Sequence, residues 1–152
     1  MRRLICYSIW LVLCLLHTTQ GANKKHLPEP KLSDTRYIID TNHGPITIEL
    51  NVEKAPISSE NFRKYAEGKH YDNLLFHRVI PDFMIQGGGL DADMKTKATQ
   101  TSIKNESFNG LANIRGSVAM ARTNEPDSAT CQFFINLKDN AFLNGNSATG
   151  KH

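Results

Sequence analysis

The residues best suited to binding or catalysis are an arginine and a glutamine, which lie among large apolar side chains between Phe76 and Gly89. If this stretch is extended, Phe76, Arg78 and Ile80 share one face, because alternate residues of a strand point the same way. An arginine in such apolar company is costly unless its five donors find partners. We therefore expect Arg78 to meet a ligand or a polar network, in a site that grips an apolar group and polarises it.

Three later blocks carry residues of similar kinds. They are Ser117–Arg122 (SVAMAR), Ser128–Asn136 (SATCQFFIN) and Asn140–Asn144 (NAFLN). In this order and at these spacings, the four blocks resemble the cyclophilin family of peptidyl-prolyl cis-trans isomerases, from about Tyr37 to Leu143. The glycine run before residue 90 lacks the Gly-x-x-x-x-Gly-Lys pattern of a phosphate-binding loop, so it does not indicate a nucleotide site.

The resemblance implies a catalytic arginine beside an apolar pocket for a proline ring. The residues implied to act in catalysis are Arg78 and Gln86. Those implied to form the pocket are Phe83, Met84, Phe134 and Leu143, with Phe142 beside them where many eukaryotic members carry Trp. Gln132, with Gln86, is implied to hydrogen-bond the substrate backbone and Arg78, and Ala121 and Arg122 are implied to line the groove for residues before the proline.

The chemistry of this pocket follows from the peptide bond. Resonance raises the barrier to rotation to about 18–20 kcal/mol, and uncatalysed Xaa-Pro isomerisation takes roughly tens to hundreds of seconds. In the twisted state the prolyl nitrogen regains a lone pair, so a rigid donor placed there binds the transition state selectively. Arg78 is the candidate donor, because guanidinium stays protonated and presents a fixed fork. No cofactor is needed, and no two histidines of the mature chain show a metal-ligand spacing.

Two other hypotheses about the function are compatible with the same pocket residues. The chain could be a proline-peptide-binding module or chaperone without catalysis, although the presence of Arg78 together with Gln86 and Phe134 favours an enzyme. It could also be an inactive fragment, because cyclophilins that resemble it continue well beyond the Phe-Leu-Asn block. On that reading the last barrel strands and a second helix are missing, and we expect residues 22–152 to fold poorly.

The elements that must position these residues are mostly strands. Tyr37–Asp40 and Ile46–Leu50 are expected to pair as a hairpin around the turn Asn42–Pro45. Ser117–Met120 and Gln132–Leu137 also have the composition of strands, whereas the polar stretch Leu90–Asn113 shows no period.

One helix is expected between these strands. Pro56–Glu67 begins with proline, has Ser58 and Ser59 as candidate caps, and is followed by Gly68 as a stop. Phe62, Tyr65 and Ala66 lie on its apolar side. The elements together predict a mainly β fold, a barrel with a helix over an open end. The resemblance implies an eight-stranded antiparallel barrel capped by two helices, with the proline pocket on its outer face.

The N-terminal region differs in kind from the rest. Residues 1–21 have the basic start, short apolar run and small residues of a secretory signal peptide, and residues 22–35 have the composition of a flexible linker. The isomerase domain is expected over residues 36–152. The run Ala121–Thr123 and Phe142 in place of Trp resemble bacterial members, so we expect export to the periplasm. Cys131 is the one cysteine of the mature chain and is expected to fill the core.

The expected partners are proline-containing polypeptides. The formal net charge of the 152-residue chain is only +3, which gives no reason to expect nucleic acid as a partner. We expect no stable membrane association after signal cleavage, and a monomer.

Overall fold

The structure is a computed structural model that describes residues 35–145. The expected signal peptide, nearly all of the expected linker and the chain end beyond Gly145 lie outside the described residues. The elements are β1 (Arg36–Thr41), β2 (Gly44–Glu49), α1 (Pro56–Glu67), β3 (Arg78–Ile80), β4 (Met84–Gly87), β5 (Val118–Met120), β6 (Phe133–Asn136) and the short 3₁₀ helix η2 (Ala141–Leu143). Among residues 35–145, no helix has the length and apolar character needed to cross a bilayer.

The first two strands form the expected hairpin. β1 and β2 pair antiparallel, with Tyr37 opposite Ile48 and Ile39 opposite Ile46. Burial alternates along β2, as its sequence predicts. The turn is shorter than expected, because pairing continues to Thr41 opposite Gly44 and leaves only two residues between the strands. Gly44 can belong to the strand because it lacks a β-carbon and adopts a φ of 111°.

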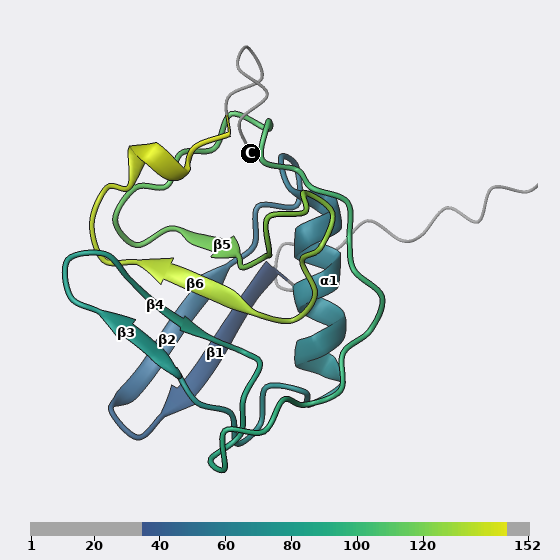
Figure 1. The fold of residues 1–152 in the computed structure, drawn as a ribbon, viewed down its shortest axis with the longest axis vertical. Helices are drawn as coiled ribbons and strands as arrows, with labels where there is room; N and C mark the ends of the chain where they lie inside the picture. The colour runs from purple at the N-terminus through teal and green to yellow at the C-terminus, as the bar shows by residue number, and fades with distance from the viewer. Residues whose placement is uncertain (1–34, 146–152) are drawn as a thin grey trace, which may run out of the picture.

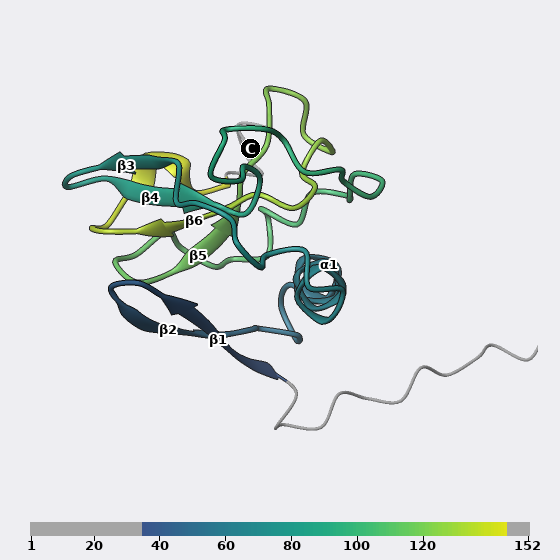
Figure 2. The same ribbon diagram turned by 90° about the horizontal axis from the view of Figure 1, so that it is seen from below.

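A second antiparallel sheet has the strand order β3-β4-β6-β5. Figure 2 shows it facing the β1–β2 hairpin as a separate layer, with α1 at one end of the two layers. The core between them is centred on Ile48, Phe62 and Phe133, each no more than 4% exposed. The strands described between residues 35 and 145 thus form two open sheets, whereas the resemblance implied a closed barrel of eight strands.

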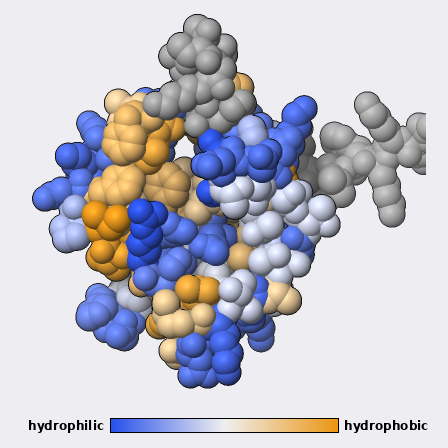
Figure 3. Space-filling view, in the orientation of Figure 1, coloured by the Kyte–Doolittle hydropathy of each residue, from blue (hydrophilic) through white to orange (hydrophobic). Residues whose placement is uncertain are grey.

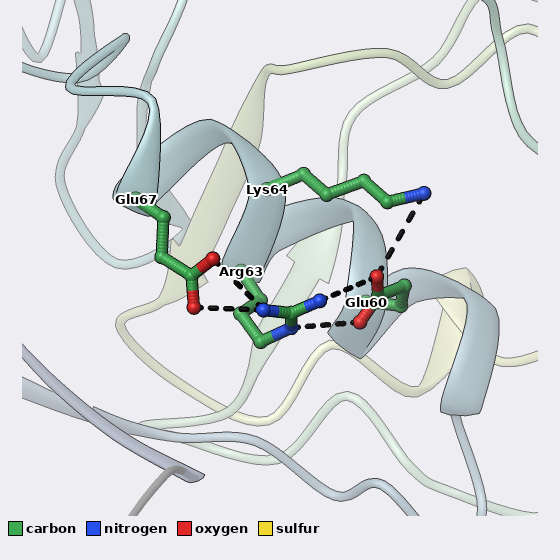
Figure 4. A network of polar contacts seen from close by, with 4 residues as sticks. All are labelled: Glu60, Arg63, Lys64 and Glu67. Carbon is green, nitrogen blue, oxygen red and sulfur yellow. Dashed lines mark hydrogen bonds and ion pairs between the residues drawn. The ribbon is translucent and has the colours of Figure 1, made fainter. Parts of the chain in front are cut away.

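Helix α1 has the predicted bounds and the predicted apolar side. Phe62 and Tyr65 are buried against the sheets. On the opposite side, Arg63 forms ion pairs with Glu60 at 2.7 Å and Glu67 at 2.8 Å, and Lys64 lies 3.7 Å from Glu60 (Figure 4). The hydrogen bonds from Arg63 lower the pKa of the Glu60 carboxyl. Pairs at this spacing stabilise the solvent side of a helix modestly.

The start of α1 is capped from a distance. Ser58 and Ser59 do not act as caps, and the N-cap residue Ala55 has no side chain that could. Instead the carboxylate of Glu106 accepts hydrogen bonds from Ile57 N at 2.9 Å and Ser58 N at 2.7 Å, and from Ser58 Oγ at 2.7 Å. The serines do not cap the helix because they lie inside its first turn, where Ser58 N itself needs an acceptor and Ser59 N already donates to Ala55 O at 2.9 Å.

The polar stretch from Leu90 to Asn113 has no regular element, as expected, and touches the strands through isolated bridges such as Ile103 with Ala129. Cys131 is 1% exposed, so the prediction that it fills the core is confirmed. Burial raises the pKa of its thiol. The neighbouring aromatic rings pack edge to face, with Phe62 and Phe133 centroids 5.6 Å apart.

Candidate functional site

The polar side chains of the site come from β3, from β4 and from Gln132, the residue just before β6; these three strands are neighbours in the four-stranded sheet (Figure 1). Arg78 of β3 lies opposite Gln86 of β4, and Gln86 lies opposite Phe134 of β6. Arg78 Nη1 donates to Gln86 Oε1 at 3.4 Å, and Gln86 Nε2 donates to Gln132 Oε1 at 2.9 Å. Pairing across strands therefore brings residues from distant blocks into one polar line.

Arg78 is more exposed than the sequence indicated. β3 is a short strand at the edge of its sheet, and both Arg78 and its neighbour Val79 are exposed. Phe76 precedes the strand, so it does not extend an apolar face on either side of the arginine. The apolar surroundings expected for Arg78 are therefore not found, whereas the expected polar partner is present as Gln86. A side chain so placed keeps donors available to a molecule that binds over β3 and β4.

An apolar wall stands beside this polar line. The ring of Phe83 stacks on that of Phe142, with centroids 5.7 Å apart and an angle of 24° between the planes. Phe83, Phe134 and Leu143 are half-buried, whereas Phe142 is 60% exposed. Figure 3 shows hydrophobic residues gathered on this face, over η2 and the neighbouring end of the β3–β4 hairpin.

The polar line and the apolar wall border one cavity of about 980 Å³. Of the ten residues predicted from the sequence, eight line it: Arg78, Phe83, Met84, Gln86, Ala121, Arg122, Phe134 and Leu143. Gln132 and Phe142 do not line it, but each contacts a residue that does: Gln132 accepts a hydrogen bond from Gln86, and Phe142 stacks on Phe83. The cavity continues inward between the two sheets as far as Phe62 and Phe133, and Met84, at 2% exposure, belongs to that inner part.

Ala121 and Arg122 form the opposite border of the groove. Ala121 N donates to Gln132 O at 2.9 Å, which ties the end of β5 to the polar line. The guanidinium of Arg122 turns toward its own loop and donates to Thr123 O at 2.7 Å. In the described structure Arg122 therefore closes the loop, and Arg78 is the cation that faces Gln86.

The glycines after Gln86 leave room for Gln132 and for the backbone of Cys131 to approach β4 closely. A β-carbon on Gly89 would lie 2.6 Å from Gln132 Cγ, and one on Gly88, whose φ is +87°, would lie 2.8 Å from Cys131 O. Sequence reasoning used these glycines only to exclude a phosphate loop and missed their contact with Gln132. The signal was present in the sequence, because consecutive glycines beside a strand indicate a close approach of another segment.

A second contact that sequence reasoning missed is that of Asn140, whose Nδ2 donates to the carbonyl oxygen of Phe83 at 2.9 Å. An asparagine just before an apolar pair resembles an ordinary loop residue, and nothing in its spacing indicates a partner 57 positions earlier. Between residues 35 and 145, no three His, Cys, Asp or Glu side chains lie close enough together to hold a metal ion. The site offers one exposed cation, two amides and an apolar wall, a set suited to binding and polarising a neutral group without a covalent step.

Comparison with known proteins identifies relatives of this arrangement. Residues 36–151 match the family described as "Cyclophilin type peptidyl-prolyl cis-trans isomerase/CLD". A peptidyl-prolyl cis-trans isomerase of Acinetobacter baylyi is 59% identical over 113 residues, which are 74% of this chain and 60% of that protein. Peptidyl-prolyl cis-trans isomerase B of Escherichia coli is 58% identical over 104 residues, 68% of this chain and 63% of that protein. The chain thus spans about three fifths of the length of these two relatives.

Solved structures show the same fold. A cyclophilin-type isomerase of Cryptosporidium parvum, determined in the presence of the dipeptide Ala-Pro, has a TM-score of 0.65 and 29% identity, covering 72% of each chain. A cyclophilin of Hirschia baltica has a TM-score of 0.66 and 24% identity, covering 73% of this chain and 60% of that one. The two open sheets described above are therefore arranged as in solved cyclophilins.

Proposed function

The chain belongs to the cyclophilin-type peptidyl-prolyl cis-trans isomerase family, and on this premise we propose that it accelerates rotation about Xaa-Pro bonds in polypeptides. The observation that carries the proposal is the pairing of Arg78 with Gln86 across β3 and β4, beside the stacked rings of Phe83 and Phe142. One part of the site can hold a proline ring while the other faces the bond that turns.

Binding comes from the apolar wall. A proline ring set against Phe83, Phe134 and Leu143 removes apolar surface from water, at about 25 cal/mol per Å². Since the ring has the same shape in the cis and trans isomers, this grip holds both. The Cryptosporidium parvum relative was determined with Ala-Pro present, and a ligand of that chemistry fits the groove proposed here.

Rate acceleration comes from Arg78. As the amide twists, the prolyl nitrogen becomes a hydrogen-bond acceptor, and a guanidinium donor directed at it stabilises the twisted state more than either planar isomer. The bond from Arg78 to Gln86 is long at 3.4 Å, so the guanidinium can turn toward the substrate while Gln86 limits its direction. Gln132 fixes Gln86 in turn through its 2.9 Å bond. No proton is transferred and no covalent bond is broken.

The test is Arg78→Ala in the full chain, with cis-trans exchange of an Ala-Pro-containing peptide followed by NMR. We expect kcat/KM to fall by about 10²–10³-fold, the usual effect of removing one preorganised donor, while the thermal unfolding temperature stays unchanged because Arg78 is exposed. Arg115→Ala is the matched control, since Arg115 is an exposed arginine outside the cavity lining. Equal kcat/KM for unmodified chain and Arg78→Ala would refute the electrostatic mechanism.

A binding module without catalysis is the second candidate, and the exposure of Arg78 favours it, because a donor in bulk water stabilises a twisted amide weakly. NMR of the protein with the same Ala-Pro-containing peptide separates the two candidate functions. Peptide binding that shifts the resonances of Phe83 and Leu143 without faster exchange supports a binding module, whereas faster exchange at unchanged affinity for both isomers supports the enzyme.

We also propose that the protein acts on exported polypeptides in the periplasm, as a monomer. The support is the sequence pattern of residues 1–21, which lie outside the described structure. Intact-mass measurement of the exported protein should find a species that begins near Ala22 or Asn23. A mass that retains residues 1–21 in the mature protein would contradict signal cleavage.

A further inference from the structure

Four asparagine side chains bond to one another beside the segments that carry Phe83 and Phe142. Asn113 Nδ2 donates to Asn144 Oδ1 at 3.2 Å, Asn136 Nδ2 donates to Asn113 Oδ1 at 3.1 Å, and Asn140 Nδ2 donates to Asn136 Oδ1 at 2.7 Å. We refer to Asn113, Asn136, Asn140 and Asn144 as the asparagine network. It ends at the carbonyl oxygen of Phe83, which accepts a further bond from Asn140 Nδ2 at 2.9 Å.

The orientation of each inner amide is fixed by its partners. Asn140 Nδ2 faces two oxygens, Phe83 O and Asn136 Oδ1, neither of which can donate, so the amide cannot be reversed without opposing acceptor to acceptor. Asn136 Nδ2 is fixed similarly, because it donates to Asn113 Oδ1 at 3.1 Å and also faces the backbone oxygen of Ser117 at 3.4 Å, which cannot donate. Donation therefore runs in one direction through the network, from Asn140 through Asn136 and Asn113 to Asn144.

These amides occupy positions where apolar side chains would be less costly. Asn140 is 0% exposed and Asn136 is 1% exposed. Asn140 Oδ1 is buried and accepts no hydrogen bond from any described residue. A buried amide with one unsatisfied oxygen costs stability, and such a group calls for an explanation beyond packing. This placement puts Nδ2 of Asn140 between Asn136 Oδ1 and the backbone oxygen of Phe83.

The network joins the two segments that carry the stacked rings. Phe83 follows Pro81 and Asp82 in the β3–β4 turn, where Asp82 has a φ of 55°. The carbonyl oxygen of Phe83 also accepts a hydrogen bond from Leu137 N at 2.9 Å. Asn140 is the residue before η2, and its own N–H donates to Asn113 O at 2.7 Å. One side chain thus connects the turn that carries Phe83 to the start of the helix that carries Phe142.

We propose that Asn140, supported by Asn136, is a positioning residue that sets the spacing between Phe83 and Phe142 and so the grip on the proline ring. The inference rests on the function proposed above. The side chain of Asn140 bonds to Phe83 O and Asn136 Oδ1 and shares no hydrogen-bond partner with Arg78, whose partner is Gln86. Because the apolar grip holds both isomers alike, loss of Asn140 raises KM and leaves kcat, whereas loss of Arg78 lowers kcat.

The experiment compares Asn140→Ala with Tyr65→Phe in the full chain. Tyr65 is also buried, and its hydroxyl accepts one backbone N–H, from Gln100 at 2.7 Å, but it lies on α1 away from the groove. We expect KM for an Ala-Pro-containing peptide to rise by about five- to tenfold in Asn140→Ala with kcat within about twofold. Tyr65→Phe should lower the unfolding temperature and leave both constants unchanged.

A second measurement does not depend on activity. The chain contains one tryptophan, Trp10, so Trp10→Phe with Phe142→Trp places a single indole on η2. Fluorescence anisotropy decay then reports how firmly η2 is held. We expect faster local rotation of this indole when Asn140→Ala is added, and no change when Tyr65→Phe is added.

The outcomes separate this inference from the proposed function. If the unmodified chain does not catalyse exchange, the proposed function fails, and the anisotropy together with the affinity for the peptide still tests Asn140. If Asn140→Ala does not unfold cooperatively, Asn144→Ala takes its place, since it removes the acceptor of Asn113 N at a half-buried position and should change KM and anisotropy in the same direction. Unchanged KM and unchanged anisotropy, or a fall in kcat alone, would overturn the assignment.

Discussion

Gln132 lies so close to Gly89 that a β-carbon there would be 2.6 Å from Gln132 Cγ and 2.7 Å from Gln132 Nε2. The bond that Gln132 accepts from Gln86 therefore depends on the absence of a methyl group at position 89. Because Gln86 in turn orients Arg78, a single small substitution remote from the substrate can loosen the donor. The direction of the Arg78 side chain thus depends on Gly89 through two intermediate contacts, those of Gln132 and Gln86.

We expect Gly89→Ala to lower kcat/KM by between about 10-fold and 100-fold, the range for a misplacement of about 1 Å at a reacting group. Gly110→Ala is the control: Gly110 has a φ of +78° and nothing within 4 Å of its β-carbon position, so the substitution costs about 1–2 kcal/mol of backbone strain without displacing a side chain. Steady-state kinetics and thermal unfolding of both variants provide the check. Equal activity of Gly89→Ala and the unmodified chain would contradict this account of Gln132.

Residue identities in the site were accessible from sequence because four short blocks carry them in a fixed order. Their exposure was not. The strand pattern around Arg78 predicted an apolar face, but β3 begins at Arg78 and lies at a sheet edge, which leaves the arginine exposed. Asn140 was missed because its partners, Phe83 and Asn136, come from a turn and a strand that only the fold brings together.

Among the elements, α1 shows most clearly which features are local. Its bounds could be predicted, since Pro56 at the start and Gly68 after the end act through backbone geometry close by. Its cap could not, because the acceptor for Ile57 N and Ser58 N belongs to Glu106. The hairpin was predictable for the same reason as the helix bounds, while the order β3-β4-β6-β5 depends on contacts between distant segments.

Removing the distant cap should destabilise the protein. We expect Glu106→Ala to lower the free energy of unfolding by about 1–2 kcal/mol, the usual cost of losing an N-cap, and Glu53→Ala, at an exposed position near the same helix, to have no measurable effect. Denaturant unfolding followed by circular dichroism gives both values. If the two variants unfold at the same denaturant concentration, the carboxylate of Glu106 does not stabilise α1.

For the molecule as a whole, stability should depend on His70. This ring is 8% exposed, packs against Tyr65 with centroids 4.7 Å apart, and has Nε2 3.3 Å from Gly88 O. The carbonyl can only accept, so Nε2 carries the proton of the neutral ring. Burial, with a smaller effect from the charge of Lys97, lowers the pKa of His70 below its ordinary value of 6.5.

The unfolded chain therefore takes up a proton on His70 at a higher pH than the folded protein does. The free energy of unfolding should fall as the pH drops below about 6.5, and this fall should end once the pH is below the lower pKa that His70 has in the folded state. We expect the unfolding temperature to fall less between pH 7.5 and pH 5 in His70→Gln, which keeps a donor for Gly88 O, than in the unmodified chain. His43→Gln, at an exposed turn, should follow the unmodified chain, and identical pH profiles for all three would contradict the role of His70.

The distance between α1 and its cap also has a consequence for the time course of synthesis. Ser58 and Glu106 are 48 residues apart in the chain, and a ribosome that adds about 5–20 residues per second needs roughly 2–10 s to make that interval. During this time the helix exists as nascent chain without the acceptor for its first N–H groups, and Phe133, which packs against Phe62 in the core, is still unmade. The growing chain is thus held short of its folded state for seconds after its first hairpin has emerged.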